Sequence, residues 1–387
     1  MLVKYGEISL RKGNRAFFEY HLMDIIRAKL KPLGKTFHVK REQGRFVIED
    51  PEGDVIYNEV IPRIKNIFGL IGFAYALQLN EKDTEKLYKC SLDYFVKYKK
   101  DGETFRVQTK RADKKFPLTS NEVSAEIGSV ILENISGLKV DLFNPEITFN
   151  IEIRNNIYIY FDSEPGEGGL PYGSTGKAVL MLSGGFDSPV AGYLCARRGV
   201  EILPLYFHSP PFVSERSLDK VMDLCKVLSE FTGKLKLIEF PFTDIQLFLK
   251  DNIPEAKLTL LMKRSMLKIS SLIANENKAH GIITGDAIGQ VSSQTLHSLA
   301  ALNSASDFPI IRPLAAMDKQ DIINIATRIG TQEISIRPYD DCCTLFLAKH
   351  PETKPNRNVI EKIEHRLGDE LIKVINDAMG KIKIHEV

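Results

Sequence analysis

The spacing of apolar residues indicates two differently built regions in the chain. In the first 160 residues, helical spacing and two-residue alternation occur together. Helices are predicted over 17–30, 84–98 and 120–133, and strands over 104–109 and 147–161. Residues 37–48 alternate on both sides of Gly44, as a hairpin does. This mixture predicts α+β structure for the first region.

Beyond residue 176 the pattern becomes a regular alternation of strands and helices. Strands are predicted over 177–182, 201–207, 235–240 and 281–284, and helices over 189–198, 218–231 and 258–275. Alternation of this kind is typical of βαβ units and predicts an α/β domain with a mainly parallel, doubly wound sheet. The remaining residues are predicted to be mostly helical.

A Gly- and Pro-rich stretch over 163–176 separates the two regions and is interpreted as a linker. The expected domains are 1–57, 58–162 and 177–387, which agrees with the two or three domains that 387 residues favour. No apolar run approaches the ~20 residues of a membrane span. The N-terminus has no secretory h-region, so a cytoplasmic protein is expected.

Charge is unevenly distributed along the chain. The first 115 residues carry +8, and because the total is +2, the remaining 272 carry −6. A basic first third suggests a polyanionic partner such as nucleic acid. A solvated Lys/Arg surface explains the same bias, so charge alone leaves both interpretations open.

The most informative motif is Ser183-Gly184-Gly185-Phe186-Asp187-Ser188, which joins the predicted strand 177–182 to the helix that follows. Two glycines allow a sharp turn, and backbone N–H groups at a helix start can hold phosphate oxygens. Ser188 is expected to cap a helix that has Pro189 in its first turn. A Walker A loop is excluded because Gly176-Lys177 is followed by Ala178 and precedes the strand. A plain Gly-Gly turn is the alternative.

This Ser-Gly-Gly-x-Asp-Ser turn resembles the signature of the PP-loop ATP pyrophosphatases, which split ATP into AMP and pyrophosphate. The resemblance implies that Ser183, Gly184, Gly185, Asp187 and Ser188 bind the phosphates of ATP. Asp187 is expected to act through Mg²⁺ or through loop geometry, because a bare carboxylate repels phosphate. ATP and Mg²⁺ are thus the expected cofactors, and no metal site made of protein ligands alone is predicted.

The basic segment from Phe105 to Pro117 places cations on a strand and the turn after it. Cations there can contact RNA phosphates, and Phe116 can pack or stack. Thr119 is expected to cap the next helix, with Glu122 at capping-box spacing. A solvated basic hairpin is the alternative. The pattern FRVxxKR…KxFPxxSxEV resembles the THUMP domain, a tRNA-binding module. The cations expected to bind tRNA are Lys4, Arg15, Arg106, Lys110, Arg111, Lys114 and Lys115.

The N-terminal residues Lys4-Tyr5-Gly6-Glu7 and Asn14-Arg15 resemble the ferredoxin-like domain that precedes THUMP in ThiI. With the PP-loop last, the order is similar to that of the ThiI-type tRNA 4-thiouridine synthetases. The resemblance implies ATP-dependent sulfur insertion at the eighth nucleotide of tRNA. It also implies a cysteine desulfurase as sulfur donor, a homodimer and a second role with the thiamine sulfur-carrier protein.

The same resemblance extends to single residues of the second region. It places Met181, Leu182, Tyr206, Phe207 and His208 around the adenine. Arg264, Gly285 and Gln294 are expected to contact the nucleotide, and Lys319 is expected to act in catalysis. Each polar residue has an ordinary alternative: Arg264 on a helix surface, Lys319 in a solvated turn and His208 as a satisfied strand-end residue.

Five cysteines are too few and too irregularly spaced for a disulfide scaffold. Cys90, Cys195 and Cys225 lie on apolar helical stripes and are expected to be buried and inert. Cys342 and Cys343 follow two acids in a loop-like stretch, and the resemblance implies that one of them carries sulfur. Adjacent acids raise a thiol pKa, so another group must activate the thiolate. Some relatives add a C-terminal rhodanese domain, for which residues up to Val387 are expected to leave no room. Either a separate sulfur carrier delivers the sulfur, or the region of Cys342 and Cys343 receives it directly.

Competing functions remain at the level of sequence. A lysidine synthetase is disfavoured by the THUMP-like segment, and a zinc or iron–sulfur thiolase by the absence of CxxC pairs. A THUMP methyltransferase is disfavoured because no [ND]-P-P-Y motif occurs. A tRNA-binding protein with a vestigial nucleotide site stays open.

Overall fold

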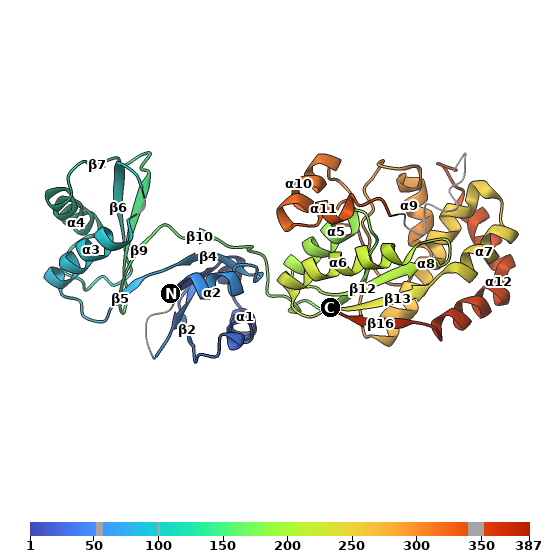
Figure 1. Ribbon diagram of the computed structural model, residues 1–387, viewed down its shortest axis with the longest axis horizontal. Helices are drawn as coiled ribbons and strands as arrows, with labels where there is room; N and C mark the ends of the chain where they lie inside the picture. Colours follow the sequence, from blue (N-terminus) through green and yellow to red (C-terminus); the bar gives the residue numbers. More distant parts are fainter. Residues whose placement is uncertain (52–56, 100, 340–351) are drawn as a thin grey trace. The chain divides into compact units, whose positions relative to one another are not determined.

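The computed structural model describes residues 1–51, 57–99, 101–339 and 352–387, which form two compact units, 1–168 and 169–387 (Figure 1). In its described residues, no helix is both long enough and apolar enough to cross a membrane.

The first unit begins with an antiparallel sheet ordered β10-β4-β1-β3-β2. Its strands are β1 (Leu2–Tyr5), β2 (His38–Glu42), β3 (Arg45–Glu49), β4 (Leu70–Ala74) and β10 (Glu164–Pro165). Helices α1 (Arg15–Leu30) and α2 (Tyr57–Ile64) belong to the same module. The hairpin predicted around Gly44 is confirmed, and Gly44 adopts the left-handed conformation that favours glycine, with φ 81°.

The second module of this unit has a mixed sheet ordered β5-β9-β8-β6-β7. Its elements are β5 (Leu77–Leu79), α3 (Thr84–Tyr98), β6 (Thr104–Arg111), α4 (Ser120–Asn134), β7 (Lys139–Val140), β8 (Ile147–Ile153) and β9 (Ile157–Phe161). The predicted capping box of Thr119 and Glu122 is present. Phe116 is buried in the core between helices and sheet, so it packs and does not stack on a partner.

Contacts between the two sheets make the first unit continuous. Tyr158 and Tyr160 of β9 pack against Leu2 and Val47 of the N-terminal sheet. A buried ion pair joins Arg45 to Glu152 at 2.9 Å. The domain boundary expected after residue 57 therefore falls inside the N-terminal module, because β4 completes its sheet, and β10 extends it from within the expected linker.

The second unit contains a six-stranded sheet ordered β15-β14-β11-β12-β13-β16 (Figure 1). All neighbouring strands are parallel except β16, which pairs antiparallel with β13. The strands are β11 (Lys177–Met181), β12 (Glu201–His208), β13 (Lys236–Pro241), β14 (Ile282–Ile283), β15 (Ile310–Ile311) and β16 (Lys383–Glu386). The expected fold class is confirmed, and β15 and β16 are additions to it.

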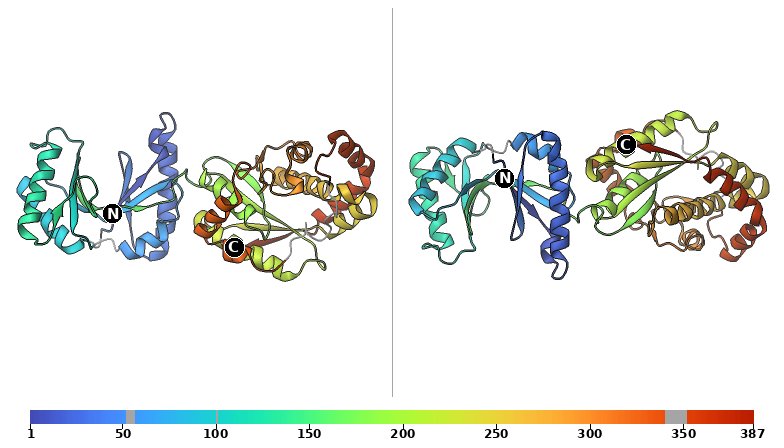
Figure 2. Two further views of the ribbon diagram at one scale, coloured as in Figure 1. Left: turned by 90° about the horizontal axis from the view of Figure 1, so that it is seen from above. Right: turned by 90° about the horizontal axis from the view of Figure 1, so that it is seen from below.

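Helices cover both faces of this sheet, as a doubly wound fold requires (Figure 2). Val179 packs into the cluster of α7, α8, α9 and α12, while the next residue, Leu180, meets Gly192 of α5. The first face carries α7 (Thr243–Asn252), α8 (Glu255–Glu276), α9 (Leu296–Asn303) and α12 (Arg357–Met379). The second carries α5 (Asp187–Arg197), α6 (Glu215–Thr232), α10 (Lys319–Ile329) and α11 (Gln332–Ser335).

The start of α5 differs from the expectation. The helix begins at Asp187 with Phe186 as its cap, two residues before the predicted start at Pro189. Ser188 is therefore inside the first turn, and the prediction that it caps the helix is wrong. Its hydroxyl contacts Ser183 across the loop.

Candidate functional site

A cavity of about 240 Å³ lies at the carboxyl ends of β11, β12 and β14 in the second unit. This edge is where open α/β sheets bind ligands. Nine residues predicted for ATP line it: Met181, Leu182, Ser183, Asp187, Ser188, Tyr206, Phe207, Gly285 and Gln294. Small-molecule pockets are typically about 300–1,000 Å³, so the cavity suits part of a nucleotide with the remainder outside it.

Hydrogen bonds across the loop hold its two ends together. The backbone N–H of Ser183 donates to Oγ of Ser188 at 2.9 Å, and the two hydroxyl oxygens are 3.1 Å apart. A Cβ on Gly285 would lie 2.8 Å from the backbone nitrogen of Ser188, so only glycine allows this approach. The loop is thus fixed from both sides. Gly184 and Gly185 belong to it without lining the cavity among the residues that the structure describes.

Asp187 is the least satisfied polar group of the loop. Its Oδ2 accepts a hydrogen bond from Nε2 of Gln290 at 3.3 Å, and its buried Oδ1 has no partner among the described residues. Burial raises the pKa of Asp187, and the negative charge of Asp286 acts in the same direction. Gln290 and the charge of Lys319, at the start of α10, oppose this shift. A cation at Oδ1 would satisfy the carboxylate.

Several cavity-lining residues were not predicted from the sequence. Helix α8 contributes Lys263, Met266 and Leu267, and α9 contributes Leu302. Thr284 and Asp286 flank Gly285 directly after β14. An acid three residues after the end of a buried strand of a parallel sheet is the signal for Asp286, because ligand-facing side chains gather at that edge. Nothing comparable in the sequence singles out Leu302.

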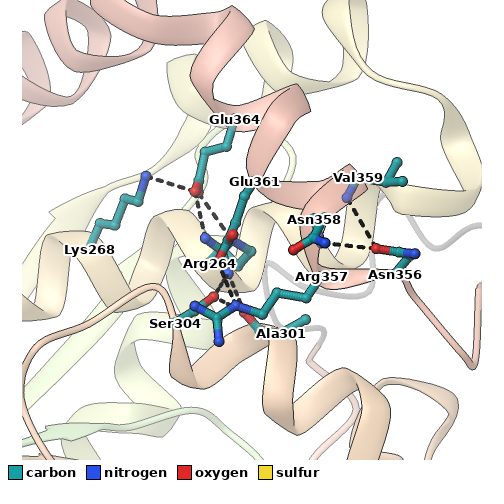
Figure 3. Close-up of polar contacts among 10 residues, drawn as sticks. All are labelled: Arg264, Lys268, Ala301, Ser304, Asn356, Arg357, Asn358, Val359, Glu361 and Glu364. Atoms are coloured by element: carbon teal, nitrogen blue, oxygen red, sulfur yellow. Dashed lines mark hydrogen bonds and ion pairs between the residues drawn. The ribbon is translucent and has the colours of Figure 1, made fainter.

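Arg264 does not line the cavity among the described residues, and its expected contact with ATP stays a prediction. Its side chain is 1% exposed and forms an ion pair with Glu364 of α12 (Figure 3). It also donates to the carbonyl of Ala301 and to the hydroxyl of Ser304. Adjacent helical residues point about 100° apart. The preceding residue, Lys263, is the cation of α8 that faces the cavity.

His208 is also turned away from the cavity lining. Its Nδ1 lies 3.0 Å from Oε1 of Glu239, and the ring is buried at the end of β12. Glu239 also lies 2.8 Å from Nε2 of His385 in β16. Nδ1 thus has the partner that the strand-end alternative expects, whereas the buried Nε2 of His208 has no hydrogen-bond partner among the described residues.

Basic side chains of the first unit border two hollows that share Arg41, Glu42 and Gln43. One hollow also includes Lys12 and Arg15, and the other includes Lys82, Lys115 and Arg154. The predicted cations Arg15 and Lys115 are thus joined by four cations that the sequence did not single out. These residues come from separate segments, which is why no local motif gathers them.

The other predicted RNA contacts divide into exposed and engaged side chains. Lys110, Lys114 and Lys115 are exposed, and none forms an ion pair with another described residue. Three other cations form hydrogen bonds within the first unit. Lys4 donates to the hydroxyl of Tyr160, Arg106 to the carbonyl of Leu142, and Arg111 to the carbonyls of Phe116 and Leu118.

Three cysteines were expected to be buried, and the structure confirms this for two of them. Cys195 and Cys225 are buried, and burial raises the pKa of each thiol to about 12. Cys90 is half-buried. Cys342 and Cys343 lie outside the described residues, so their role stays a prediction.

The architecture defines a class: a PP-loop α/β domain preceded by ferredoxin-like and THUMP modules. Residues 1–74 match the ThiI ferredoxin-like domain, residues 81–162 the THUMP domain, and residues 173–368 the family described as thiamine biosynthesis protein (ThiI). The chain belongs to the ThiI family of tRNA sulfurtransferases.

Relatives resemble the chain over nearly its whole length. A probable tRNA sulfurtransferase of Lachnoclostridium phytofermentans is 45% identical over 98% of this chain and 96% of its own. One of Thermoanaerobacter pseudethanolicus is 44% identical over 97% of each. The crystal structure of a 4-thiouridine synthetase–RNA complex with bound ATP is 38% identical, with a TM-score of 0.88 over 100% of this chain and 98% of that one.

Proposed function

We propose that this protein is a tRNA 4-thiouridine synthetase that uses ATP to activate a uridine at the eighth nucleotide and replaces its O4 with sulfur. The observation that carries the proposal is the Ser183–Ser188 loop closing on a cavity at the sheet edge, in a chain that also carries a THUMP module. The relative solved with RNA and ATP supports the same two ligands.

In this proposal, Met181, Leu182, Tyr206 and Phe207 surround the base, and the loop faces the phosphates. The Oδ1 of Asp187, which has no partner in the described part of the chain, fits a Mg²⁺ ion, because divalent magnesium prefers carboxylate and phosphate oxygens. When bound, the ion offsets the charge of the phosphates. Lys319, whose charge already acts on Asp187, adds positive charge on the same side.

The reaction has three steps. The uridine O4 attacks the α-phosphorus of ATP, and the bond from that phosphorus to pyrophosphate breaks. The terminal sulfur of a persulfide then attacks C4, the C4–O4 bond breaks, and AMP leaves with O4. A thiol finally cleaves the sulfur–sulfur bond and forms a disulfide. Adenylation is needed because the carbonyl oxygen is otherwise a poor leaving group.

A cysteine desulfurase is the proposed source of the persulfide, directly or through a separate carrier. We propose that Cys342 or Cys343 receives the sulfur, and single Cys→Ser substitutions test this. One variant is expected to lose thiolation while still releasing pyrophosphate from ATP, because adenylation precedes sulfur transfer. Cys225→Ser, at a buried thiol, is the control. Unchanged thiolation in both test variants would remove this role.

The raised pKa of Asp187 predicts how activity depends on pH and Mg²⁺. A protonated carboxyl cannot bind the ion, so the acid limb of the pH–rate profile should lie above the range of an ordinary aspartate. Mg²⁺ competes with the proton, so raising its concentration should move this limb to lower pH. An acid limb that is independent of Mg²⁺ would contradict the proposed contact.

The exposed lysines of the first unit predict the salt dependence of tRNA binding. Replacing Lys114 and Lys115 by alanine should weaken binding and reduce the slope of log K against log salt by about one for each phosphate that is no longer neutralised. The matched control is Lys234→Ala, an exposed lysine of the second unit. A slope that changes equally in the control would show that these two lysines have no special role.

The second candidate is a tRNA-binding protein with a vestigial nucleotide site. Pyrophosphate release that depends on ATP and is stimulated by tRNA distinguishes the enzyme from it. A homodimer and a role in thiamine sulfur transfer are further parts of the proposal. They rest on the family alone, in which the match over 173–368 carries the thiamine description.

A further inference from the structure

Asp286 is a buried carboxylate in the cavity wall for which the proposed reaction has no use. Its side chain is 12% exposed, and a carboxylate so far from water is stable only when cations or donors neutralise it. Oδ1 lies 3.4 Å from Nζ of Lys263 and accepts from Nε2 of Gln294 at 3.3 Å. Oδ2 accepts from the hydroxyl of Thr284 at 2.8 Å and lies 3.5 Å from Nε of Arg312.

Asp286 and Asp187 line one cavity but have opposite electrostatic environments. Burial pushes the pKa of Asp286 upward, but the charges of Lys263 and Arg312, with the two hydrogen bonds, hold that pKa below its usual value. Asp286 is therefore ionised and its oxygens are occupied. The Oδ1 of Asp187 remains unpartnered among the described residues, so Asp187, and not Asp286, is available to a metal ion.

The ionised Asp286 constrains two neighbours that line the cavity. A carboxylate only accepts hydrogen bonds, so Gln294 must turn its NH₂ group toward it and its carbonyl oxygen away. That Oε1 is buried and has no partner among the described residues. The ammonium of Lys263 is held between Asp286 and Oγ of Ser293, which lies 3.0 Å away.

We propose that Asp286 is a positioning residue, which fixes the ammonium of Lys263 and the amide orientation of Gln294 and thereby sets the affinity for ATP without contacting it. Lys263 presents positive charge to the anionic nucleotide, and Gln294 presents an acceptor to a hydroxyl or amino group. The inference rests on the proposed function, because it takes the cavity to hold ATP. It makes the polarity of the cavity wall depend on a lining carboxylate whose two oxygens are engaged by other side chains.

Equilibrium dialysis with ATP and Mg²⁺ on the full chain tests this role. Asp286→Asn keeps the shape of the side chain but loses its charge, and it should raise the Kd for ATP about tenfold, the scale of a hydrogen bond to a charged group. Lys263→Met should have a comparable effect. If Asp286 acts through Lys263, the double variant should bind little more weakly than Lys263→Met alone, because coupled residues are not additive.

Steady-state measurement of pyrophosphate release separates positioning from a general loss of structure. Asp286→Asn should raise KM for ATP and leave kcat and the Mg²⁺ dependence nearly unchanged, whereas loss of folded protein lowers kcat alone. Should Asp286→Asn fail to fold, Thr284→Val removes one hydrogen bond to Oδ2 at constant shape and should raise KM in the same way.

The outcomes that overturn the inference are specific. An unchanged Kd in Asp286→Asn, or effects of Asp286→Asn and Lys263→Met that add fully, would show that Asp286 does not act through Lys263. A shifted Mg²⁺ requirement would make Asp286 a metal ligand instead. A wild-type protein that binds no ATP would refute the proposed function, and with it this inference, before any variant is compared.

Discussion

Replacing Asp187 by alanine should lower ATP-dependent thiolation by about a hundred- to a thousand-fold, the usual effect of removing one group that stabilises charge in the transition state. Asp187 lines the cavity, is the only acid of the Ser183–Ser188 loop and has a buried oxygen without a described partner. Without it, the loop has no carboxylate that can hold a cation beside the phosphates. Thiolation and pyrophosphate release, each measured at saturating ATP, should fall together.

Stability distinguishes this effect from unfolding. The pKa of Asp187 in the folded protein lies above that of the unfolded chain, so its charged form costs stability at neutral pH, and the cost disappears as pH falls below the folded-state pKa. Asp187→Ala should therefore melt at the same temperature as the wild type or above it. Asp219→Ala, on the exposed side of α6, is the matched control and should keep full activity. Full activity in Asp187→Ala would refute the assignment of the loop.

Replacing Arg264 by alanine should have the largest effect on stability. Among the described residues, the change leaves Glu364, which is 8% exposed, with the half-exposed Lys268 as its one cation, at 2.9 Å (Figure 3). Breaking a buried ion pair typically costs about 3–5 kcal/mol. The carbonyl of Ala301 also loses a donor. For a unit of this size, such a loss lowers Tm by ~10 °C.

Two controls accompany this experiment. Arg357→Ala removes an exposed pair with Glu361 on the same helix, α12, and should change Tm far less (Figure 3). Replacing both partners, with Arg264→Met and Glu364→Leu, should restore most of the lost stability because no buried charge remains. A stable Arg264→Ala protein that no longer binds ATP would instead return Arg264 to the nucleotide.

The sequence predicts the parts of this fold that local patterns encode. The loop is predictable because strand, glycine turn and helix follow one another directly, and the Thr119 cap is predictable because its capping box is complete within four residues. In contrast, β16 has the sequence Lys-Ile-His-Glu, and most of its side chains are exposed. It is a strand because it pairs with β13. The residues of β16 alone do not predict that pairing. The same holds for β4, whose place beside β1 fixes the N-terminal module beyond residue 57.

In the site, too, the local sequence does not determine which single side chains face the cavity. Helix α8 is buried on most of its circumference, so its pattern does not tell whether Lys263 or Arg264 faces the sheet edge. The family resemblance places Arg264 at the nucleotide, whereas Lys263 is the α8 cation that lines the cavity in the described residues and Arg264 pairs with Glu364. The hollows around Arg41 likewise join residues more than a hundred positions apart, from Lys12 to Arg154, which no spacing rule connects.

Nucleoside analysis of tRNA tests the central claim most directly. Unmodified tRNA is incubated with the protein, ATP, Mg²⁺, a cysteine desulfurase and cysteine, then digested and separated. The proposed function predicts 4-thiouridine at the eighth nucleotide, formed only when ATP is present and accompanied by AMP and pyrophosphate. Tight tRNA binding without 4-thiouridine or pyrophosphate would contradict it and would identify the protein as a tRNA binder with a vestigial nucleotide site.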